Sequence, residues 1–359
     1  SLLLLFACGQ EAERSAKPLS SDTLTATQND STQRQAAPDL PTYDKRILFE
    51  GEIGDYPVEM ELEITGDEIR GSYRYTSQQA RLKLEGKVDE VGDYVMAEYT
   101  AEGEKTGLLI GEQGFQGRFT GSWMKTDSTG ELLLLLYPSE VIERNINEYT
   151  PPELRYQVNH IKKVAENGTC EIDIFYPFFF SFPDGLAERI NSAMMGPSEA
   201  EVAQQLSECQ SDNDPDAMPS VINEGFTING FVGPIMSITT DFYAYFSGAA
   251  HGNYGSETQN FDMRTGQLLE AKDIFAFGYQ KALSELFGQR LMDTYPEDHN
   301  YFSYTGIAEE QDFEFFADSV AVYFDPYEIA PYAAGQIKLK VGYDEIEAYI
   351  REDGPLGLR

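Results

Sequence analysis

The sequence predicts an α+β protein, in which an all-β meander that closes into a small barrel precedes an α+β domain of antiparallel sheets with packed helices. In the first part, apolar residues alternate with glutamate from Val58 to Ile64, the period-two pattern of a half-buried strand. Glycine-containing turn signals recur about every ten residues as far as Pro138. Beyond Pro152, strand-like and helical stretches occur in mixed order, which favours α+β over a parallel doubly wound sheet.

The first module covers residues 45–138 and contains about eight short strands joined as hairpins. It has an internal echo, because Ile69–Tyr73 (IRGSY) resembles Phe119–Trp123 (FTGSW). Closing the meander into a barrel would remove its exposed edges. A barrel of this size either holds a small ligand or is filled by its own side chains, and no sequence feature favours a pocket.

Residues 139–155 are polar and contain Pro151-Pro152, which predicts a linker before the second domain at residues 156–350. Asp184 and Ser198 are expected to cap two helices. The remaining expected elements are a strand pair around 170–175, a strand-like stretch over 226–246, a return strand at 259–263, a helix over 278–295 that buries Leu283, Leu286, Phe287 and Leu291, strands at 313–316, 320–324 and 336–341, and a final helix capped by Asp344.

Two of the three cysteines are expected to pair. Cys209 falls on the apolar stripe of the second helix, where it can reach the strand that carries Cys170. In an exported protein a disulfide is favoured over the alternative of two buried thiols. Closing a loop of this length stabilises the fold by roughly 4 kcal/mol on the chain-entropy description.

The N-terminal residues resemble an export signal. The apolar run Ser1–Ala7 is too short to span a bilayer and resembles the end of a signal peptide. Leu5–Cys8 resembles a bacterial lipobox, so residues 1–8 are assigned to a signal remnant with Cys8 as the lipidated residue. Residues 9–44 are rich in Ser, Thr, Gln and Ala and predict a flexible tether. We therefore expect a lipid-anchored protein of the bacterial cell envelope, in the periplasm or at the cell surface.

The formal net charge is −35, with 61 acidic and 26 basic residues. Phosphate backbones require a basic face, so this charge excludes nucleic acid as a partner. The acidic surface is open to two interpretations. It either attracts a basic extracellular protein or serves only to keep the chain soluble.

His251 is one of three histidines and lies in a glycine-bounded loop between two strand-like stretches. A catalytic interpretation combines it with Ser247 and Asp241, although no Gly-x-Ser-x-Gly elbow surrounds Ser247. The favoured interpretation is structural, with His251 hydrogen-bonded to the loop backbone. No His or Cys pair has the spacing of zinc ligands, and the sequence predicts no cofactor.

The two-proline segment Asp325–Gly335 is the best candidate for a recognition loop. Tyrosines provide rigid contact area, and prolines reduce the entropy that is lost on binding. The alternative is that its tyrosines pack inward and hold the last sheet together. The predicted binding residues are Tyr327, Pro331 and Tyr332 of this segment, with His251, Asn253 and Tyr254 of the histidine loop.

The second domain resembles a known family over about residues 156–350. The residues that carry the resemblance are Tyr176-Pro177, Gly248–Gly252, Asp262, Thr265-Gly266, Asp273–Phe275 and Phe324–Gly335. The pattern is similar to that of the extracellular region of RsiV-type anti-sigma factors, which also occurs in some bacterial peptidoglycan deacetylases. That family often has Gly-Gly-Ala-His where this chain has Gly248-Ala249-Ala250-His251.

The resemblance implies a binding domain that contacts lysozyme directly, through loops that approach the lysozyme cleft. The sequence shows no counterpart of the deacetylase metal ligands, so we expect a surface-displayed, non-catalytic binding domain for lysozyme or a cell-wall-related ligand. The alternatives are a cell-envelope hydrolase that acts through His251, and small-ligand binding by the N-terminal barrel.

Overall fold

The computed structural model describes residues 44–114, 117–127, 129–144, 146–180, 185–209, 218–295 and 302–359. Thr42–Arg359 forms one compact unit. The predicted lipidation site Cys8 and the predicted helix cap Asp184 lie outside the described residues. In the described ranges, no helix has the length and apolar character needed to cross a membrane.

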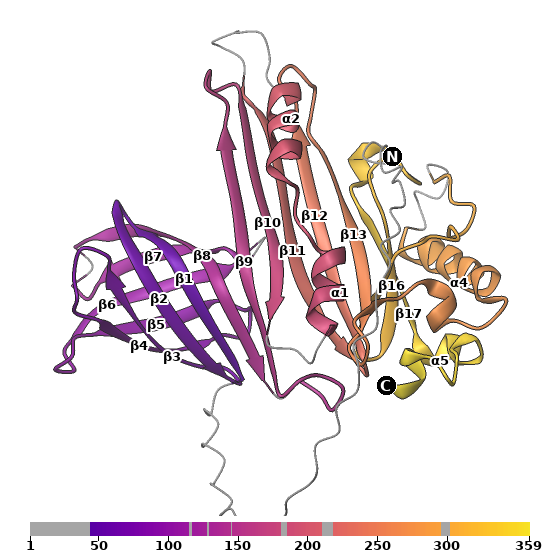
Figure 1. The fold of residues 1–359 in the computed structure, drawn as a ribbon, viewed down its shortest axis with the longest axis horizontal. Helices are drawn as coiled ribbons and strands as arrows, with labels where there is room; N and C mark the ends of the chain where they lie inside the picture. The colour runs from indigo at the N-terminus through magenta and orange to yellow at the C-terminus, as the bar shows by residue number, and fades with distance from the viewer. Residues whose placement is uncertain are drawn as a thin grey trace, which may run out of the picture. The chain divides into compact units, whose positions relative to one another are not determined.

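The predicted barrel is confirmed (Figure 1). Its antiparallel strands follow one another in chain order, and β1 also pairs with β8, which closes the sheet on itself. The strands are β1 (Lys45–Ile53), β2 (Tyr56–Thr65), β3 (Glu68–Tyr75), β4 (Leu82–Val88), β5 (Tyr94–Tyr99), β6 (Lys105–Gln113), β7 (Phe119–Lys125) and β8 (Glu131–Arg144).

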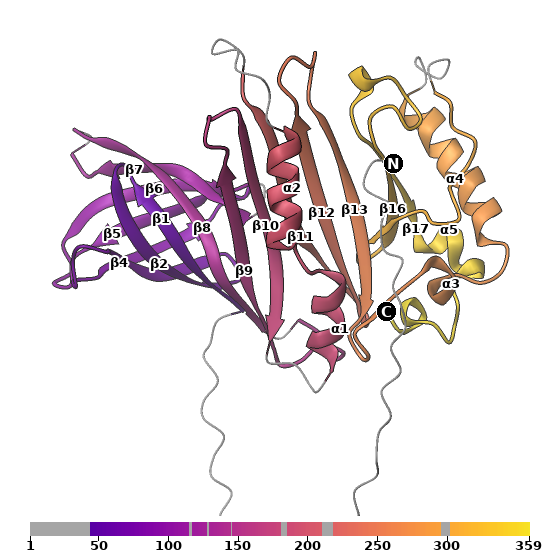
Figure 2. The same ribbon diagram turned by 45° about the horizontal axis from the view of Figure 1, so that its top comes forward.

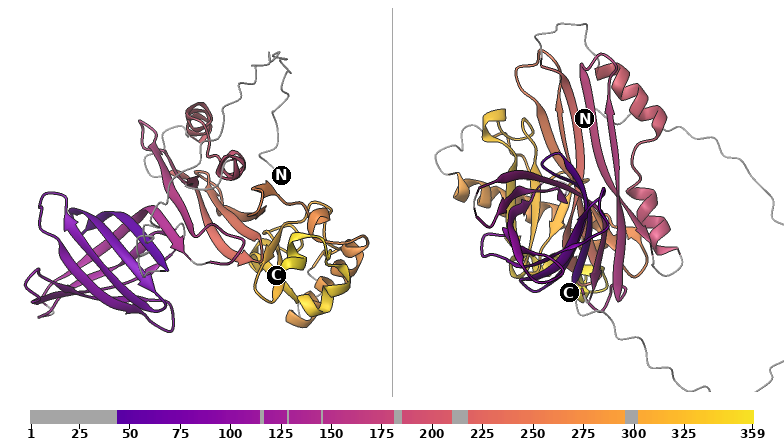
Figure 3. Two further views of the ribbon diagram at one scale, coloured as in Figure 1. Left: turned by 60° about the horizontal axis from the view of Figure 1, so that its bottom comes forward. Right: turned by 90° about the vertical axis from the view of Figure 1, so that its left-hand side faces the viewer.

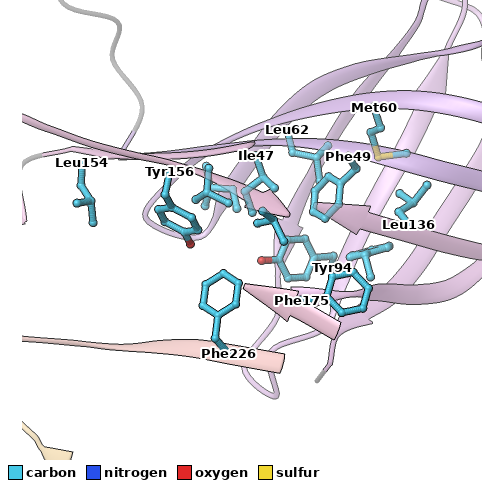
Figure 4. Packing of buried hydrophobic residues seen from close by; sticks show 14 of the residues in the cluster. Ile47, Phe49, Met60, Leu62, Tyr94, Leu136, Leu154, Tyr156, Phe175 and Phe226 are labelled. Atoms are coloured by element: carbon cyan, nitrogen blue, oxygen red, sulfur yellow. The ribbon is translucent and has the colours of Figure 1, made fainter. Parts of the chain in front are cut away.

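Apolar side chains occupy the barrel interior. The alternation in β2 has the predicted sense, since Val58, Met60, Leu62 and Ile64 are buried. Phe119 packs edge-on against Phe49 and Tyr94, with ring centroids 6.1 and 5.2 Å away, respectively. The apolar packing continues past the barrel to Tyr156, Phe175 and Phe226 (Figure 4).

The similar sequences in β3 and β7 both contribute a hydrogen-bond donor to Glu98. The last residue of each copy, Tyr73 or Trp123, donates a hydrogen bond to Oε2 of this carboxyl group, at 2.9 Å from Trp123 Nε1. Thr106 Oγ1 donates to Oε1 at 2.5 Å. Glu98 is only 2% exposed, so these donors replace the water that the carboxyl group loses on burial.

The predicted linker is shorter than residues 139–155. Strand β8 continues to Arg144 because Val141 and Ile142 are buried, and β9 (Glu153–Val164) begins within the expected linker. The two strands then pair antiparallel, with Val141 opposite Tyr156. The barrel sheet therefore continues directly into the sheet of the second region.

The second region extends this sheet with six strands. They are β9, β10 (Cys170–Phe180), β11 (Ser220–Val232), β12 (Ile235–Tyr245), β13 (Asn253–Asp262) and β14 (Gln267–Leu268). Strands β10 and β11 are parallel, and the crossover that such a pair requires contains α1 and α2. The other neighbours are antiparallel. The stretch expected over 226–246 is divided into β11 and β12 by a turn at Gly233, whose φ is 53°.

Helices α1 (Leu186–Ala193) and α2 (Glu199–Cys209) cover one face of this sheet (Figures 2 and 3). The predicted cap of α2 is confirmed, because Ser198 Oγ accepts from the Glu201 amide at 3.3 Å. The predicted disulfide is also confirmed. Cys209 at the end of α2 is bonded to Cys170 at the start of β10, with Cα atoms 5.8 Å apart.

A second, smaller sheet and three helices complete the chain. The elements are α3 (Ala271–Ile274), α4 (Tyr279–Thr294), β15 (Phe313–Phe315), β16 (Ser319–Phe324), β17 (Ile337–Gly342) and α5 (Tyr343–Ile346), with short 3-10 turns η3 (Tyr332–Ala334), η4 (Glu347–Tyr349) and η5 (Pro355–Leu358). Helix α4 buries Leu283, Phe287 and Leu291 as expected, whereas Leu286 is only partly buried. The prediction that Asp344 caps the last helix is wrong. The cap is Gly342, whose amide donates to Glu345 Oε1 at 3.0 Å.

Candidate functional site

Two loops bring together His251, Tyr254, Tyr327 and Tyr332, which we call the aromatic patch. The first two residues lie at the β12–β13 connection, and the tyrosines Tyr327 and Tyr332 lie between β16 and β17. The imidazole of His251 stacks on the Tyr332 ring with centroids 3.8 Å apart. Tyr254 meets the same ring edge-on at 5.9 Å, and Tyr327 lies 5.6 Å from it. Residues far apart in the sequence thus form one surface.

Hydrogen bonds hold the two loops in register. The Tyr332 hydroxyl donates to the Gly252 carbonyl at 2.7 Å, and His251 Nδ1 lies 2.9 Å from the same oxygen. Because a carbonyl only accepts, we assign the imidazole proton to Nδ1. In the neutral ring, Nε2 then accepts from the Tyr327 hydroxyl, 3.2 Å away. Both ring nitrogens of His251 are therefore used to fix loops.

The geometry does not assemble a catalytic triad at His251. Asp241 Oδ1 accepts from Ser256 Oγ at 2.5 Å, and the Ser247 amide donates to Ser220 Oγ at 2.9 Å. The hydrogen bonds of Asp241 and Ser247 thus lead away from the imidazole. The arrangement suits a loop-fixing histidine, which is the structural interpretation of the sequence.

Tyr327 has an unusual backbone conformation for its type. Its φ is 72°, and among the described residues it alone has a positive φ without being glycine. A bulky L-residue costs of the order of 1–2 kcal/mol in this region. A short turn imposes the conformation, since the Tyr327 amide donates to the Ala330 carbonyl at 3.1 Å and the Glu328 amide to the Asp325 carbonyl at 3.0 Å. The turn projects the side chain outward, where it is 63% exposed.

Tyr243 extends the patch, and the sequence analysis did not identify it as a site residue. It faces Tyr254 across the β12–β13 pair. A β-carbon on Gly252 would lie 2.5 Å from the Tyr243 ring, so only glycine permits this close approach. Phe242 and Phe246 are also exposed nearby in sequence. The run of aromatic residues in β12 was the available signal, but the strand pattern alone does not distinguish surface from core.

Two carboxyl groups, those of Asp325 and Asp241, accept hydrogen bonds from Ser256, two residues after Tyr254 of the patch. Asp325 Oδ1 accepts from the Ser256 amide at 3.2 Å and from Gln336 Nε2 at 2.9 Å. Burial raises the pKa of Asp325. Burial also raises the pKa of Asp241, and the nearby charge of Asp325 raises it further. Asp241 and Asp325 therefore form an acidic pair at the strand segment that carries Tyr254.

The structure thus places four of the six predicted binding residues in direct contact. Asn253 and Pro331 are exposed and directly precede Tyr254 and Tyr332 in the chain. Tyr327 does not pack inward, whereas Tyr332 is half-buried against His251. Across the described ranges, no group of three His, Cys, Asp or Glu side chains has an arrangement that could hold a metal ion.

Comparison with known proteins identifies one domain. The family described as "Protein of unknown function (DUF3298)" matches residues 272–344, which lie inside the region predicted to be RsiV-like. That finer assignment stays a prediction. No curated protein matches the chain.

Two solved structures are similar to part of the chain. A member of the DUF3298 family from Bacteroides fragilis has 20% identity and a TM-score of 0.48, over 57% of this chain and 96% of its own. A DUF3298 family protein from Pseudomonas aeruginosa PAO1 has 18% identity and a TM-score of 0.41, over 55% of this chain and 94% of its own. Residues 272–344, from α3 to the start of α5, are a DUF3298 domain.

Proposed function

We propose that this protein is a lipid-anchored, non-catalytic binding protein of the bacterial cell envelope that recognises a basic extracellular protein such as lysozyme. The aromatic patch is the binding surface, and Cys8 is the lipidated residue. The observation that carries the proposal is the exposed Tyr327, which a strained turn holds outward beside Tyr332 and His251. Backbone strain at an exposed aromatic residue is typical of a functional position.

The chemistry of the patch suits a protein partner. Tyrosine rings provide large contact areas with little side-chain entropy to lose, and tyrosine is enriched among the residues that dominate binding energies. The hydrogen bonds through Gly252 preorganise the two loops, which reduces the ordering cost of binding.

The net charge of the chain indicates that its partner is positively charged. A net charge of −35 accelerates association with a basic protein. Asp241 and Asp325 add negative charge at Ser256, two residues after Tyr254 of the patch, so a lysine or arginine of the partner would gain from both cation–π contact and charge.

The test is binding to lysozyme over a salt series, with cytochrome c as an equally basic but unrelated protein and chito-oligosaccharide as a competitor. We expect binding to lysozyme that persists at physiological salt, inhibits lysozyme activity and is displaced by the sugar. Equal binding to both basic proteins that disappears with screening would show that only the acidic surface acts, and would reject recognition at the patch.

A matched pair of tyrosine variants locates the surface. Tyr327→Ala is expected to weaken lysozyme binding at least about tenfold, as the loss of a central aromatic contact does. The control is Tyr56→Ala on barrel strand β2, where the tyrosine is 59% exposed. A Tyr327→Gly variant relieves the positive φ and should lose binding without losing stability. Equal effects at both tyrosines would contradict the assignment.

A further inference from the structure

A cavity of about 970 Å³ lies between β13 and the DUF3298 domain, separate from the four residues of the aromatic patch. It is bounded by Thr258 and Asn260 of β13, by helix α3, by the first turn of α4, by residues 309–312, by Phe313 at the start of β15 and by Arg351. Its size is that of a site for a small molecule. Neither the sequence resemblance nor the proposed function gives it a role.

One wall of the cavity is aromatic. Phe275 stacks on Tyr279 with centroids 5.2 Å apart and meets the Phe313 ring edge-on at 5.0 Å. Phe277 also lines the cavity and is 104% exposed, so its ring has no packing partner within the described chain. Such a ring is available to cover an apolar group of a ligand.

Three basic side chains line the cavity in an otherwise acidic chain. Lys272, Lys281 and Arg351 line it on α3, α4 and the segment after η4. Their partners are exposed carboxylates, as in the Arg351–Asp353 pair with Nη2–Oδ2 at 2.9 Å. Exposed pairs of this kind are weak, so a ligand carboxylate can join or replace them. Residues 309–312 place Glu309, Glu310 and Asp312 on a different element of the same cavity.

Asp312 is the most distinctive polar group of the cavity. Its Oδ2 accepts from the Thr258 amide at 3.3 Å. Burial raises its pKa to about 6, and the charges of Glu257, Asp325 and Glu328 add to this effect. The charged groups that shift the pKa of Asp312 are thus all acidic. An ammonium group on a ligand would provide a counter-cation.

We propose that this cavity binds a short peptide with free termini. Asp312 receives the ammonium group, and Lys272 and Arg351 face the carboxylate. The exposed Phe277 and the half-buried Tyr279 contact an apolar side chain, while the buried Phe275 packs behind Tyr279. A ligand with one sign of charge would meet unfavourable groups at one wall, whereas a zwitterion with an apolar body matches both walls. The proposal is independent of lysozyme binding, because it uses no residue of the aromatic patch.

The test uses the full chain and the dipeptide Gly-Phe in isothermal titration calorimetry, beside its N-acetylated and C-amidated forms. We expect saturable binding of Gly-Phe, and weakening of at least about tenfold when either terminus is blocked, since each block removes a charge-assisted contact. The absence of saturable binding up to about 10 mM, or equal binding of the blocked forms, would overturn the proposal.

Two matched variants connect the ligand to the cavity. Asp312→Asn keeps an acceptor for the Thr258 amide but removes the charge, and should weaken Gly-Phe binding at least about tenfold. Asp293→Asn, at an exposed position of α4 outside the cavity, should bind as the wild type does. Thermal unfolding of both variants checks that they are folded. An unchanged affinity in Asp312→Asn would reject the proposed site. Tyr327→Ala should retain Gly-Phe binding, which separates this result from that for lysozyme.

Discussion

Glu98 of the barrel and Asp312 of the region that follows it are carboxyl groups held in opposite surroundings. In the barrel, Glu98 receives hydrogen bonds from Tyr73, Trp123 and Thr106. In the second region, Asp312 has one amide donor from Thr258 and several acidic neighbours. The donors around Glu98 satisfy its hydrogen-bonding capacity, whereas the acidic neighbours of Asp312 make its ionised form unfavourable.

This difference separates stability from function. A fully hydrogen-bonded carboxyl group in a closed barrel is a structural feature, because the donors replace its solvent. Acidic groups held close together cost stability and are typical of positions that bind or react. We therefore expect the barrel to be the more stable part of the fold, and both proposed sites use residues of the second region.

The disulfide provides the largest expected effect. The barrel closes through the β1–β8 pairing, whereas the second region joins α2 to β10 covalently. Replacing Cys170 and Cys209 together with alanine should lower the free energy of unfolding by about 4 kcal/mol, because the unfolded chain regains the entropy of the closed loop. Urea unfolding of the double variant and of the reduced wild type should agree. A loss below about 1 kcal/mol would show that packing alone holds this region.

The barrel carboxyl group provides the next effect. Glu98→Leu removes the acceptor of three donors and should lower the free energy of unfolding by about 2–4 kcal/mol. Glu85→Leu on neighbouring strand β4 is exposed and should change stability by less than about 0.5 kcal/mol. Chemical denaturation of the two variants measures the difference. Similar small losses at both positions would contradict the view that Glu98 is a structural group.

The smallest expected change in the free energy of unfolding is at Asp312, where the substitution should stabilise the fold. Its pKa of about 6 lies above the ordinary value of 3.8, so the folded chain binds the proton more tightly than the unfolded chain does. Its contribution to stability therefore rises as the pH falls from above 6 towards 4, and the ionised group destabilises the fold at pH 7.5. Asp312→Asn should raise the free energy of unfolding at pH 7.5 by about 1–2 kcal/mol, less than the full value of the pKa difference because the group is partly solvated.

The measurement for Asp312→Asn is urea unfolding at pH 7.5 and at pH 4. The gain over the wild type should disappear at pH 4, where the aspartate is already neutral. Asp293→Asn is the control at both values. A destabilised Asp312→Asn variant at pH 7.5 would mean that the charge of Asp312 supports the fold, and the contrast with Glu98 would not hold.

Local patterns predicted the elements well where one periodicity dominated. The alternation in β2 and the turn glycines were sufficient for the barrel, and the stripe with Cys209 was sufficient for the disulfide. The predicted linker over 139–155 is partly strand, because Val141 and Ile142 are buried. The polar composition of the segment does not indicate this burial. Asp344 resembles a cap in sequence, but the chain begins the helix at Tyr343, two residues earlier than a cap at Asp344 requires.

The candidate site was predicted as residues but not as a surface. His251 and Tyr332 were both predicted as binding residues. Their stacking, however, depends on two loops that lie far apart in the sequence, before β13 and after β16. Tyr243 lies in an aromatic run that the strand pattern could not assign to surface or core, and the cavity beside Asp312 had no local signal because distant segments create it.

By itself, the sequence determined the order of strands and helices, the acidic character and the pairing of Cys170 with Cys209, since these depend on periodicity, composition and spacing along the chain. Only the tertiary structure decided that Tyr73 and Trp123 share Glu98, that Tyr327 is held outward and that Asp312 lies among like charges. The physical reason is that hydrogen-bond partners, desolvation and charge repulsion depend on distances in space, and these arise only when segments far apart in the chain pack together.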